Sequence, residues 1–353
     1  MDILPLVDRI GEAPTAALFG LITGMLFGVA AQRSSFCLRA ATVEFARGQM
    51  GPRVSVWLLT FSTALVWVQA AEMFGLMRSS EARMMAVTGS WSGAILGGLI
   101  FGVGMVLARG CSGRLLVLAA TGNLRSLISG LIFAVVAQMS LGGWLAPVRD
   151  SLAALWVTPG GHNVNIINAL GLPASSGLVL GLALALFAIV LSMRNKLAVS
   201  TLIFASGVGF AVAVGWVLTY TLSQVAFEPV QVESATFTGP SANALMFVLD
   251  RNAVLKFDIG LVPGVFIGAF LAAILKKEFV FQGFQDADNM KRAMTGAALM
   301  GFGGMLAGGC AIGNGVTGGS ILVATAWVAL TAMWVGAMAT DFVVDQSGLR
   351  AAA

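Results

Sequence analysis

The sequence predicts an all-α integral membrane protein that has about nine transmembrane helices, short re-entrant half-helices and two inverted repeats within a single domain (residues 1–350). Of its 353 residues, 58% are apolar and only 10% are charged, whereas a soluble domain carries about 25% charged residues. Too few polar side chains remain to cover a surface in water, so the lipid bilayer is the main solvent. The apolar stretches are about 20 residues long, which suits helices rather than the roughly ten-residue strands of a membrane barrel.

Nine stretches are long and apolar enough to span a membrane. They are residues 14–32, 54–76, 90–108, 125–146, 173–193, 199–222, 257–275, 293–308 and 318–343. Four intervening segments are too short to cross and are typical of half-helices or re-entrant turns, namely 37–47, 111–121, 243–250 and 310–316. The 44 glycines fit this plan, because glycine lets helices pack closely and tolerates unwound turns.

The distribution of charge predicts an orientation. Three segments rich in Lys and Arg are predicted to face the cytoplasm by the positive-inside rule, namely 33–53, 109–125 and 276–292. Segment 223–250 has no Lys or Arg and is predicted to face outward. Nine crossings then place the N-terminus outside and the C-terminus inside. Arg78 and Arg83 fall on the wrong side of this assignment.

An internal repeat relates the two halves of the chain. Residues 102–111 align without gaps on residues 301–310, and six of the ten positions are identical. The same offset places the apolar run 59–71 over 258–270. An odd number of predicted crossings separates the two copies, so the repeats, 14–146 and 173–343, are expected to be inverted. Inverted repeats with broken helices are a recurring plan of secondary transporters.

The three cysteines are the main candidates for chemistry. Cys111 lies between Gly110 and Gly113, and Cys310 lies between Gly309 and Gly313. Glycines on both sides of a cysteine allow a sharp turn, and a helix that starts after the turn directs its positive end at a ligand. A membrane cysteine is often only a small buried hydrophobe, but two of these three occupy matching positions in a diverged repeat.

The third cysteine, Cys37, follows the first apolar stretch and has no evident counterpart in the second half. Three widely spaced cysteines do not indicate a disulfide framework or a C-x-x-C metal site. Four arginines lie near a cysteine in sequence and form candidate anion-binding groups, namely Arg33, Arg39, Arg109 and Arg114. The alternative interpretation is that each arginine is an interfacial residue.

Several other functions are disfavoured. No P-loop, dinucleotide fingerprint or H-E-x-x-H motif is present, so we expect no primary pumping by this chain alone, no cofactor, no metal and no nucleic-acid partner. Glu44 and Glu72 are the acidic residues closest to apolar segments. They are candidates for proton coupling, although helix capping or pairing with a nearby arginine explains them more simply.

The motifs Arg33-Ser-Ser-Phe-Cys37, Ala108-Arg-Gly-Cys-Ser-Gly113 and Ala307-Gly-Gly-Cys-Ala-Ile-Gly313 give the chain its resemblance to the YeeE/YedE family of bacterial membrane proteins. The resemblance extends over nearly the whole chain. It implies an hourglass-shaped, multi-pass protein of the bacterial cytoplasmic (inner) membrane, with thiosulfate as substrate and with Cys37, Cys111 and Cys310 along its path. Some members are associated with small sulfur carriers, so the resemblance also suggests a cytosolic TusA-like partner.

Two functional hypotheses follow from the motifs and the resemblance. In the first, neutral thiols offer weak S–H donors in series to a sulfur anion that passes through the membrane. In the second, the protein is a membrane sulfurtransferase, in which Cys37 or Cys111, activated by nearby arginines, holds a persulfide and passes sulfur to a cytosolic carrier. A third, an accessory subunit of another complex, is also open. The residues alone indicate a small anion, and thiosulfate comes from the resemblance.

Overall fold

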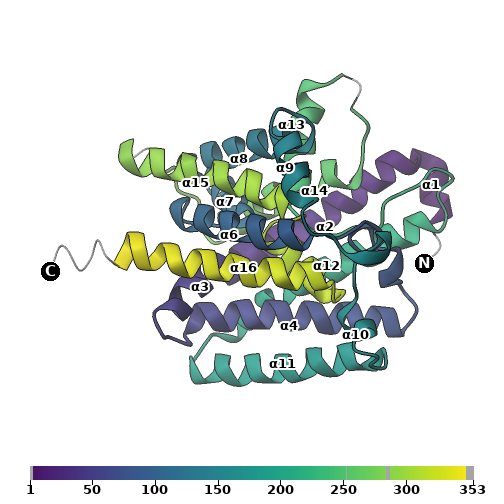
Figure 1. The fold of residues 1–353 in the computed structure, drawn as a ribbon, viewed down its shortest axis with the longest axis horizontal. Helices are drawn as coiled ribbons and strands as arrows, with labels where there is room; N and C mark the ends of the chain where they lie inside the picture. Colours follow the sequence, from purple (N-terminus) through teal and green to yellow (C-terminus); the bar gives the residue numbers. More distant parts are fainter. Residues whose placement is uncertain (1–2, 252, 284–286, 347–353) are drawn as a thin grey trace.

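The computed structural model describes residues 3–251, 253–283 and 287–346, and these residues form helices and loops without any β-strand. Among the described residues, nine long helices build the body of the molecule (Figure 1). They are α2 (Glu12–Ser34), α4 (Pro52–Met73), α6 (Trp91–Leu107), α8 (Leu124–Gly142), α11 (Ser175–Arg194), α12 (Val199–Ser223), α14 (Phe257–Leu275), α15 (Ala287–Leu306) and α16 (Ala324–Thr340).

Shorter elements lie between the long helices. Three half-length helices are α3 (Leu38–Ala46), α7 (Ser112–Ala120) and α13 (Thr238–Leu249), and a π-helix, η3 (Gly313–Gly318), lies between α15 and α16. The remaining helices cover the ends of the bundle, namely α1 (Leu4–Ile10), α5 (Arg83–Ala86), α9 (Ala146–Ala153) and α10 (Ile166–Ala169), together with the short η1 (Ser79–Glu81), η2 (Pro159–Gly161) and η4 (Asp341–Gln346).

The prediction of an all-α membrane protein is confirmed. In the described residues, eight helical stretches are long and apolar enough to cross a membrane, and two of them, Glu12–Ala46 and Trp91–Ala120, are each broken into a long and a short helix. The ninth expected stretch, 293–308, lies in α15. That helix is 20 residues long, but it begins with a charged stretch that includes Lys291 and Arg292. It is therefore not one of the eight apolar helical stretches.

The boundaries of two predicted segments differ from the observed ones. The last span starts at Ala324 instead of residue 318, because residues 318–320 end the short helical segment that contains η3 and residues 321–323 form the turn after it. The short segment expected at 243–250 is the end of a longer helix, α13.

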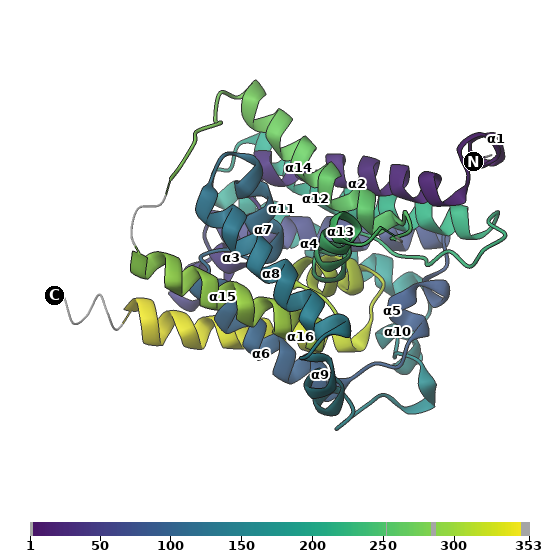
Figure 2. The ribbon, with the colours of Figure 1, turned by 90° about the horizontal axis from the view of Figure 1, so that it is seen from above.

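The long helices run in alternating directions between two ends of the bundle (Figures 1 and 2). We call them the α1 end, where α1 lies, and the α16 end, where α16 finishes. The helices α2, α6, α11, α14 and α16 run toward the α16 end, and the other long helices run back. In both views α3 and α7 lie nearer the α16 end, and α13 lies nearer the α1 end. Helix α11 is the outermost and packs mainly on α4.

Glycine spacing explains the closest helix pair, α2 with α14. Each helix carries glycines every fourth residue, and a β-carbon at any of them would collide with the backbone of the facing helix; these are Gly20, Gly24, Gly28, Gly260, Gly264 and Gly268. Contact between backbones replaces contact between side chains, as is usual for membrane helices.

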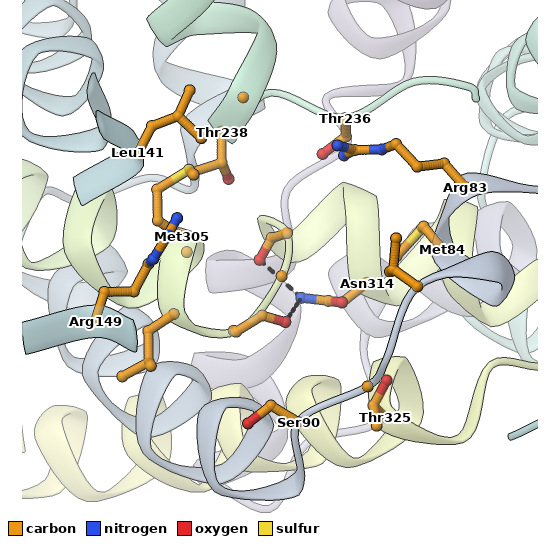
Figure 3. A pocket seen from close by; sticks show the side chains of 18 of the residues that line it. Arg83, Met84, Ser90, Leu141, Arg149, Thr236, Thr238, Met305, Asn314 and Thr325 are labelled. Atoms are coloured by element: carbon orange, nitrogen blue, oxygen red, sulfur yellow. Dashed lines mark hydrogen bonds between the residues drawn. The ribbon is translucent and has the colours of Figure 1, made fainter. Parts of the chain in front are cut away.

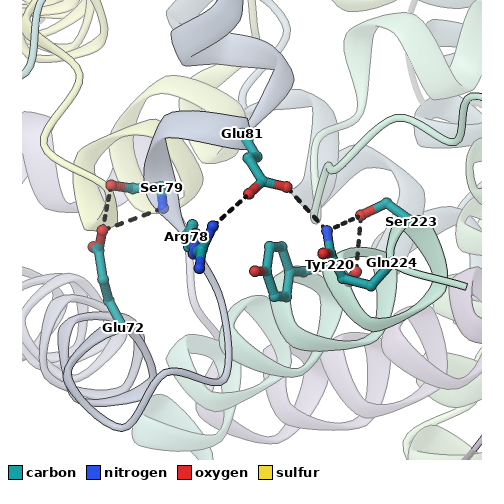
Figure 4. A network of polar contacts seen from close by, with 7 residues as sticks. All are labelled: Glu72, Arg78, Ser79, Glu81, Tyr220, Ser223 and Gln224. Carbon is teal, nitrogen blue, oxygen red and sulfur yellow. Dashed lines mark hydrogen bonds and ion pairs between the residues drawn. The ribbon is translucent and has the colours of Figure 1, made fainter.

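The two acidic residues at the helix ends are engaged in local structure. The Glu44 carboxylate accepts a hydrogen bond from the backbone N–H of Val54 at 2.8 Å, in the first turn of α4. This confirms the capping interpretation for Glu44. Glu72 accepts hydrogen bonds from the backbone N–H of Ser79 at 3.2 Å and from its hydroxyl at 2.6 Å (Figure 4).

Arg78 belongs to the same polar network. It pairs with Glu81 at 3.6 Å, and the Gln224 amide donates to Glu81 at 3.0 Å, which joins the loop after α4 to the end of α12 (Figure 4). Arg78, one of the two arginines that contradicted the positive-inside pattern, therefore stabilises a loop at the α1 end.

Candidate functional site

Each cysteine follows the same backbone turn. The helices α2, α6 and α15 end in a residue of left-handed conformation, namely Ser35 (φ 53°), Arg109 (φ 58°) and Gly308 (φ 75°). In each turn the next residue donates its N–H back to a carbonyl five residues earlier; for example, Gly110 bonds to Met105 at 3.0 Å and Gly309 bonds to Gly304 at 2.9 Å. This is the Schellman arrangement that closes a helix. A cysteine is the next residue in all three cases.

The cysteines therefore lie at the starts of the short helical segments. Cys37 and Cys111 are the N-cap residues of α3 and α7. Cys310 precedes the helical segment 311–320, and its sulfur accepts the N–H of Gly313 at 3.4 Å. The backbone N–H groups of Ala40 and Arg114, three residues after Cys37 and Cys111, approach those two sulfurs in the same manner. All three thiols thus lie at the positive ends of short helices.

The structure brings Cys37 and Cys111 together. Their side chains interact directly, and the Arg114 side chain is close enough to act on Cys37 electrostatically. Cys111 is 1% exposed. Cys310, which is fully buried, belongs to the opposite half of the molecule, near enough to Cys111 for an electrostatic interaction.

The Arg114 guanidinium is incompletely satisfied. Its Nη1 atom is buried and has no hydrogen-bond partner among the residues that the structure describes, and the same is true of the hydroxyl of Ser112. A buried charged donor left unpaired costs on the order of 1–3 kcal/mol or more. These two donors lie in the first turn of α7, directly after Cys111, so the first turn can accept an anion.

The other arginines occupy different positions. Arg109 is exposed at the turn before Cys111, and it lies close to Arg125 together with Arg39, so three positive charges gather at the α16 end. The guanidinium carbon of Arg33 lies 4.9 Å from the ring centroid of Phe204 on α12. Arg33 therefore packs on an aromatic ring rather than beside a thiol.

A cavity of about 310 Å³ opens at the α1 end (Figure 3). We call it the α1-side cavity. It extends between Arg83 and Arg149 to Gly309, Asn314 and Thr236. The amide of the buried Asn314 donates to the carbonyl oxygens of Gly309 at 2.7 Å and Ala307 at 3.3 Å, which holds the turn before Cys310.

The inner end of the α1-side cavity leads to Cys310. The hydroxyl of Thr236, which lines the cavity, lies 4.0 Å from the sulfur of Cys310. Beyond this point two buried apolar side chains, Ile312 and Phe237, pack against Gly113 of α7. The segments that follow Thr236 and Cys310 therefore contact the first turn of α7 through apolar side chains.

Sequence reasoning missed several residues of this site. Thr236, Asn314 and Arg149 were not candidates, and Arg83 was noted only as an exception to the charge pattern. Two signals could have found the arginines and Thr236. A cation on the wrong side of a membrane protein marks a position where charge is needed locally, and the repeat offset that aligns Cys111 with Cys310 also aligns Cys37 with Thr236.

Comparison with known proteins gives consistent matches. Residues 33–339 match the sequence pattern of the family described as "Sulphur transport". The chain is 26% identical over 348 residues to the thiosulfate transporter TsuA of Escherichia coli (strain K12), covering 93% of this chain and 94% of that protein. It is also 26% identical over 327 residues to the thiosulfate transporter TsuA of Spirochaeta thermophila, covering 88% and 93%.

Proposed function

We propose that this chain, which belongs to the sulphur transport family, takes up thiosulfate across the bacterial cytoplasmic membrane. The observation that carries the proposal is the buried Nη1 of Arg114, which has no partner in the described part of the chain and lies beside the Cys37 and Cys111 thiols. A guanidinium in that position favours an anion, and the thiols beside it can donate weak hydrogen bonds to a sulfur or oxygen atom of that anion. Both similar proteins named above are thiosulfate transporters, which supports this choice of anion.

The path that we propose runs along the axis of the molecule. The ion enters the α1-side cavity between Arg83 and Arg149, reaches Cys310, passes Ile312 and Phe237, and then meets Cys111 and Cys37. Each neutral thiol donates an S–H hydrogen bond that is weak enough to be released. A series of weak sites suits conduction, because the ion must leave each site as readily as it arrives.

We assign the α16 end to the cytoplasm. Most of the twenty Lys and Arg residues belong to helix ends and loops at that end: Arg33, Arg39, Arg47, Arg53, Arg109, Arg125, Arg194, Lys196, Lys276, Lys277, Lys291 and Arg292. The positive-inside rule then places the α1-side cavity on the outer face. The three gathered arginines, Arg39, Arg109 and Arg125, attract the dianion to the cytoplasmic mouth.

The contact between Cys37 and Arg114 also favours a second candidate function, sulfurtransfer. A Cys37 thiolate would attack the terminal sulfur of thiosulfate, the S–S bond to the sulfonate would break, and sulfite would leave with the electron pair. The resulting persulfide would pass its sulfur to a TusA-like carrier in the cytosol. The two functions differ in what crosses the membrane.

Doubly labelled thiosulfate distinguishes the two functions. Purified protein in liposomes is supplied with thiosulfate that carries ³⁴S at the terminal position and ¹⁸O in the sulfonate, and the internal contents are analysed by mass spectrometry. Transport predicts that both labels accumulate inside in one intact ion and that the cysteines stay unmodified. Sulfurtransfer predicts a persulfide on the protein and free ¹⁸O-sulfite in place of intact thiosulfate. Protein-containing liposomes that accumulate no more label than empty ones contradict the transport proposal.

A further inference from the structure

Thr236 occupies the position in the second half of the chain that Cys37 occupies in the first. The offset that overlays residues 102–111 on 301–310 places Cys37 on Thr236. Cys37 is the N-cap of α3, and Thr236 lies two residues before α13 begins. Both short helices pack against the long helix that follows them, α4 in the first half and α14 in the second.

The contacts between the long helices show the same correspondence between the two halves of the chain. Helix α2 packs on α14 as α12 packs on α4, and α6 packs on α16 as α15 packs on α8. An exchange of the two halves, 14–146 and 173–343, therefore maps these interfaces onto each other. We infer from this pattern that the halves are inverted copies, each of which contributes two short helical segments that begin near the centre.

The contacts of Thr236 repeat those of Cys37. In the first half the Cys37 side chain meets Cys111, and in the second half the Thr236 hydroxyl lies 4.0 Å from the Cys310 sulfur. Each half thus contributes one pair of small polar groups. The pair in the second half has room because Gly313 lacks a side chain: a β-carbon there would collide with the Thr236 hydroxyl.

The backbone before Thr236 is held in place by other residues. The Thr317 hydroxyl donates to the carbonyl of Ala235, and the Ser234 hydroxyl donates to the carbonyl of Val212 at 2.6 Å. The hydroxyl of Thr236 itself has only the Cys310 thiol as a hydrogen-bond partner within the described ranges. Its position is therefore fixed while its donor capacity remains available to a ligand at the inner end of the α1-side cavity.

We propose that Thr236 is a fourth binding group for the transported anion, whose hydroxyl donates to a sulfonate oxygen while Cys310 donates to the terminal sulfur. This inference rests on the proposed function. A hydroxyl is a stronger donor than a thiol and suits an oxygen acceptor, whereas S–H is a weak donor. Unequal donors at one position orient the ion, and they make Thr236 a determinant of selectivity for anions that carry both oxygen and sulfur.

Three variants test this role by uptake of labelled thiosulfate into liposomes. Thr236→Val keeps the shape of the side chain and removes the donor, and Thr236→Ser keeps the donor. Thr23→Val is the matched control, because Thr23 is a fully buried threonine of α2 whose hydroxyl has no partner in the described part of the chain. We expect Thr236→Val to raise the half-saturating thiosulfate concentration about tenfold, as for one lost hydrogen bond to a charged group. Thr236→Ser and Thr23→Val should stay within about twofold of the native protein.

Competition separates a binding role from a structural one. Sulfate offers only oxygen acceptors, so its ability to inhibit thiosulfate uptake should fall more in Thr236→Val than the affinity for thiosulfate itself. A merely structural threonine would change both by the same factor. Native-like affinity and inhibition in Thr236→Val overturn the inference while uptake by the native protein still upholds the proposed function. Absence of uptake by the native protein rejects both.

Discussion

The Cδ1 atom of Ile312 occupies the space into which a β-carbon at Gly113 would project. Ile312 belongs to the segment that follows Cys310, and Gly113 belongs to the first turn of α7, after Cys111. The two halves of the molecule therefore meet at an apolar contact between their cysteines. The nearest atom of the Phe237 ring lies 3.3 Å from the same β-carbon position, which is also a tight contact.

Gly113→Ala should severely reduce thiosulfate uptake. The added methyl group displaces Ile312 and fills the point where the ion must pass, so we expect a loss of at least tenfold in the maximal rate. Gly110→Ala is the matched control, because a β-carbon at Gly110 has its nearest neighbour at 3.5 Å, an ordinary contact. Equal rates for the two variants in the liposome assay would show that the Ile312 contact is not on the path.

Arg114→Gln should weaken thiosulfate binding more strongly than Arg33→Gln. The Arg114 Nη1 atom is buried without a partner in the described residues, whereas Arg33 rests on the Phe204 ring. Loss of a charge-assisted hydrogen bond predicts an increase of about 10- to 100-fold in the half-saturating concentration. Concentration series of initial uptake rates measure both variants. A larger effect at Arg33 would place the anion elsewhere.

Arg109→Gly should stabilise the protein and impair transport at the same time. Arg109 has a left-handed conformation that costs a non-glycine residue about 1–2 kcal/mol, and the equivalent residue of the second half is Gly308. We expect a gain of about 1 kcal/mol in unfolding free energy in detergent. Slower uptake should accompany it, because one of the three gathered arginines is lost. Ser35→Gly relieves the same backbone conformation without removing a charge, and it should leave uptake unchanged.

Thiosulfate affinity should depend on pH through Glu233, in the loop before α13. Burial, followed by repulsion from Asp258, raises the pKa of Glu233 to about 8, and Arg83 and Lys256 partly oppose this increase. Below pH 8 the Glu233 carboxyl group is neutral. The Arg83 guanidinium, whose Nε atom lies 4.0 Å from Oε2 of Glu233, then attracts anions with its full positive charge. Above pH 8 the carboxylate forms and offsets that charge. We expect the half-saturating concentration to rise when the pH at the α1 end is increased from about 7 to about 9.

The stability of the folded protein should also depend on pH through Glu233. The folded pKa lies above the ordinary glutamate value of about 4.3, so the contribution of Glu233 to stability is fully present below that value and is lost as pH rises through about 8. Glu233→Gln should remove this dependence and should keep high thiosulfate affinity at pH 9. An unchanged pH profile in Glu233→Gln would exclude Glu233 as the titrating group.

Sequence patterns predicted the parts of this fold that depend on composition. Apolar stretches of about 20 residues located the long helices, and the high glycine content indicated close helix packing without showing which helices form the closest pair. The exact ends of the short helices could not be predicted, because a π-helix adds a residue between Cys310 and α16. The left-handed residue after the short segment comes eleven residues after Cys111, at Gly122, but twelve after Cys310, at Leu322.

The sequence predicted the site residues that lie within the cysteine motifs. It did not predict the residues that the fold brings to the site from distant segments. The cysteines and Arg114 were candidates because glycines and basic residues surround them in sequence. Thr236 contacts Cys310 across 74 residues of chain, and a lone threonine in a polar loop has no local signature of binding. Arg149 and Asn314 reach the α1-side cavity from helices that the sequence does not show to be neighbours.

Uptake of ³⁵S-labelled thiosulfate into liposomes by the Cys37→Ala, Cys111→Ala and Cys310→Ala variants is the most direct test that the thiols form the path. The variants are compared with the native protein and with Thr23→Val at equal amounts of folded protein. We expect each cysteine variant to lose at least nine-tenths of the native rate, while Thr23→Val retains it. Native rates in all three cysteine variants would show that the thiols do not form the path.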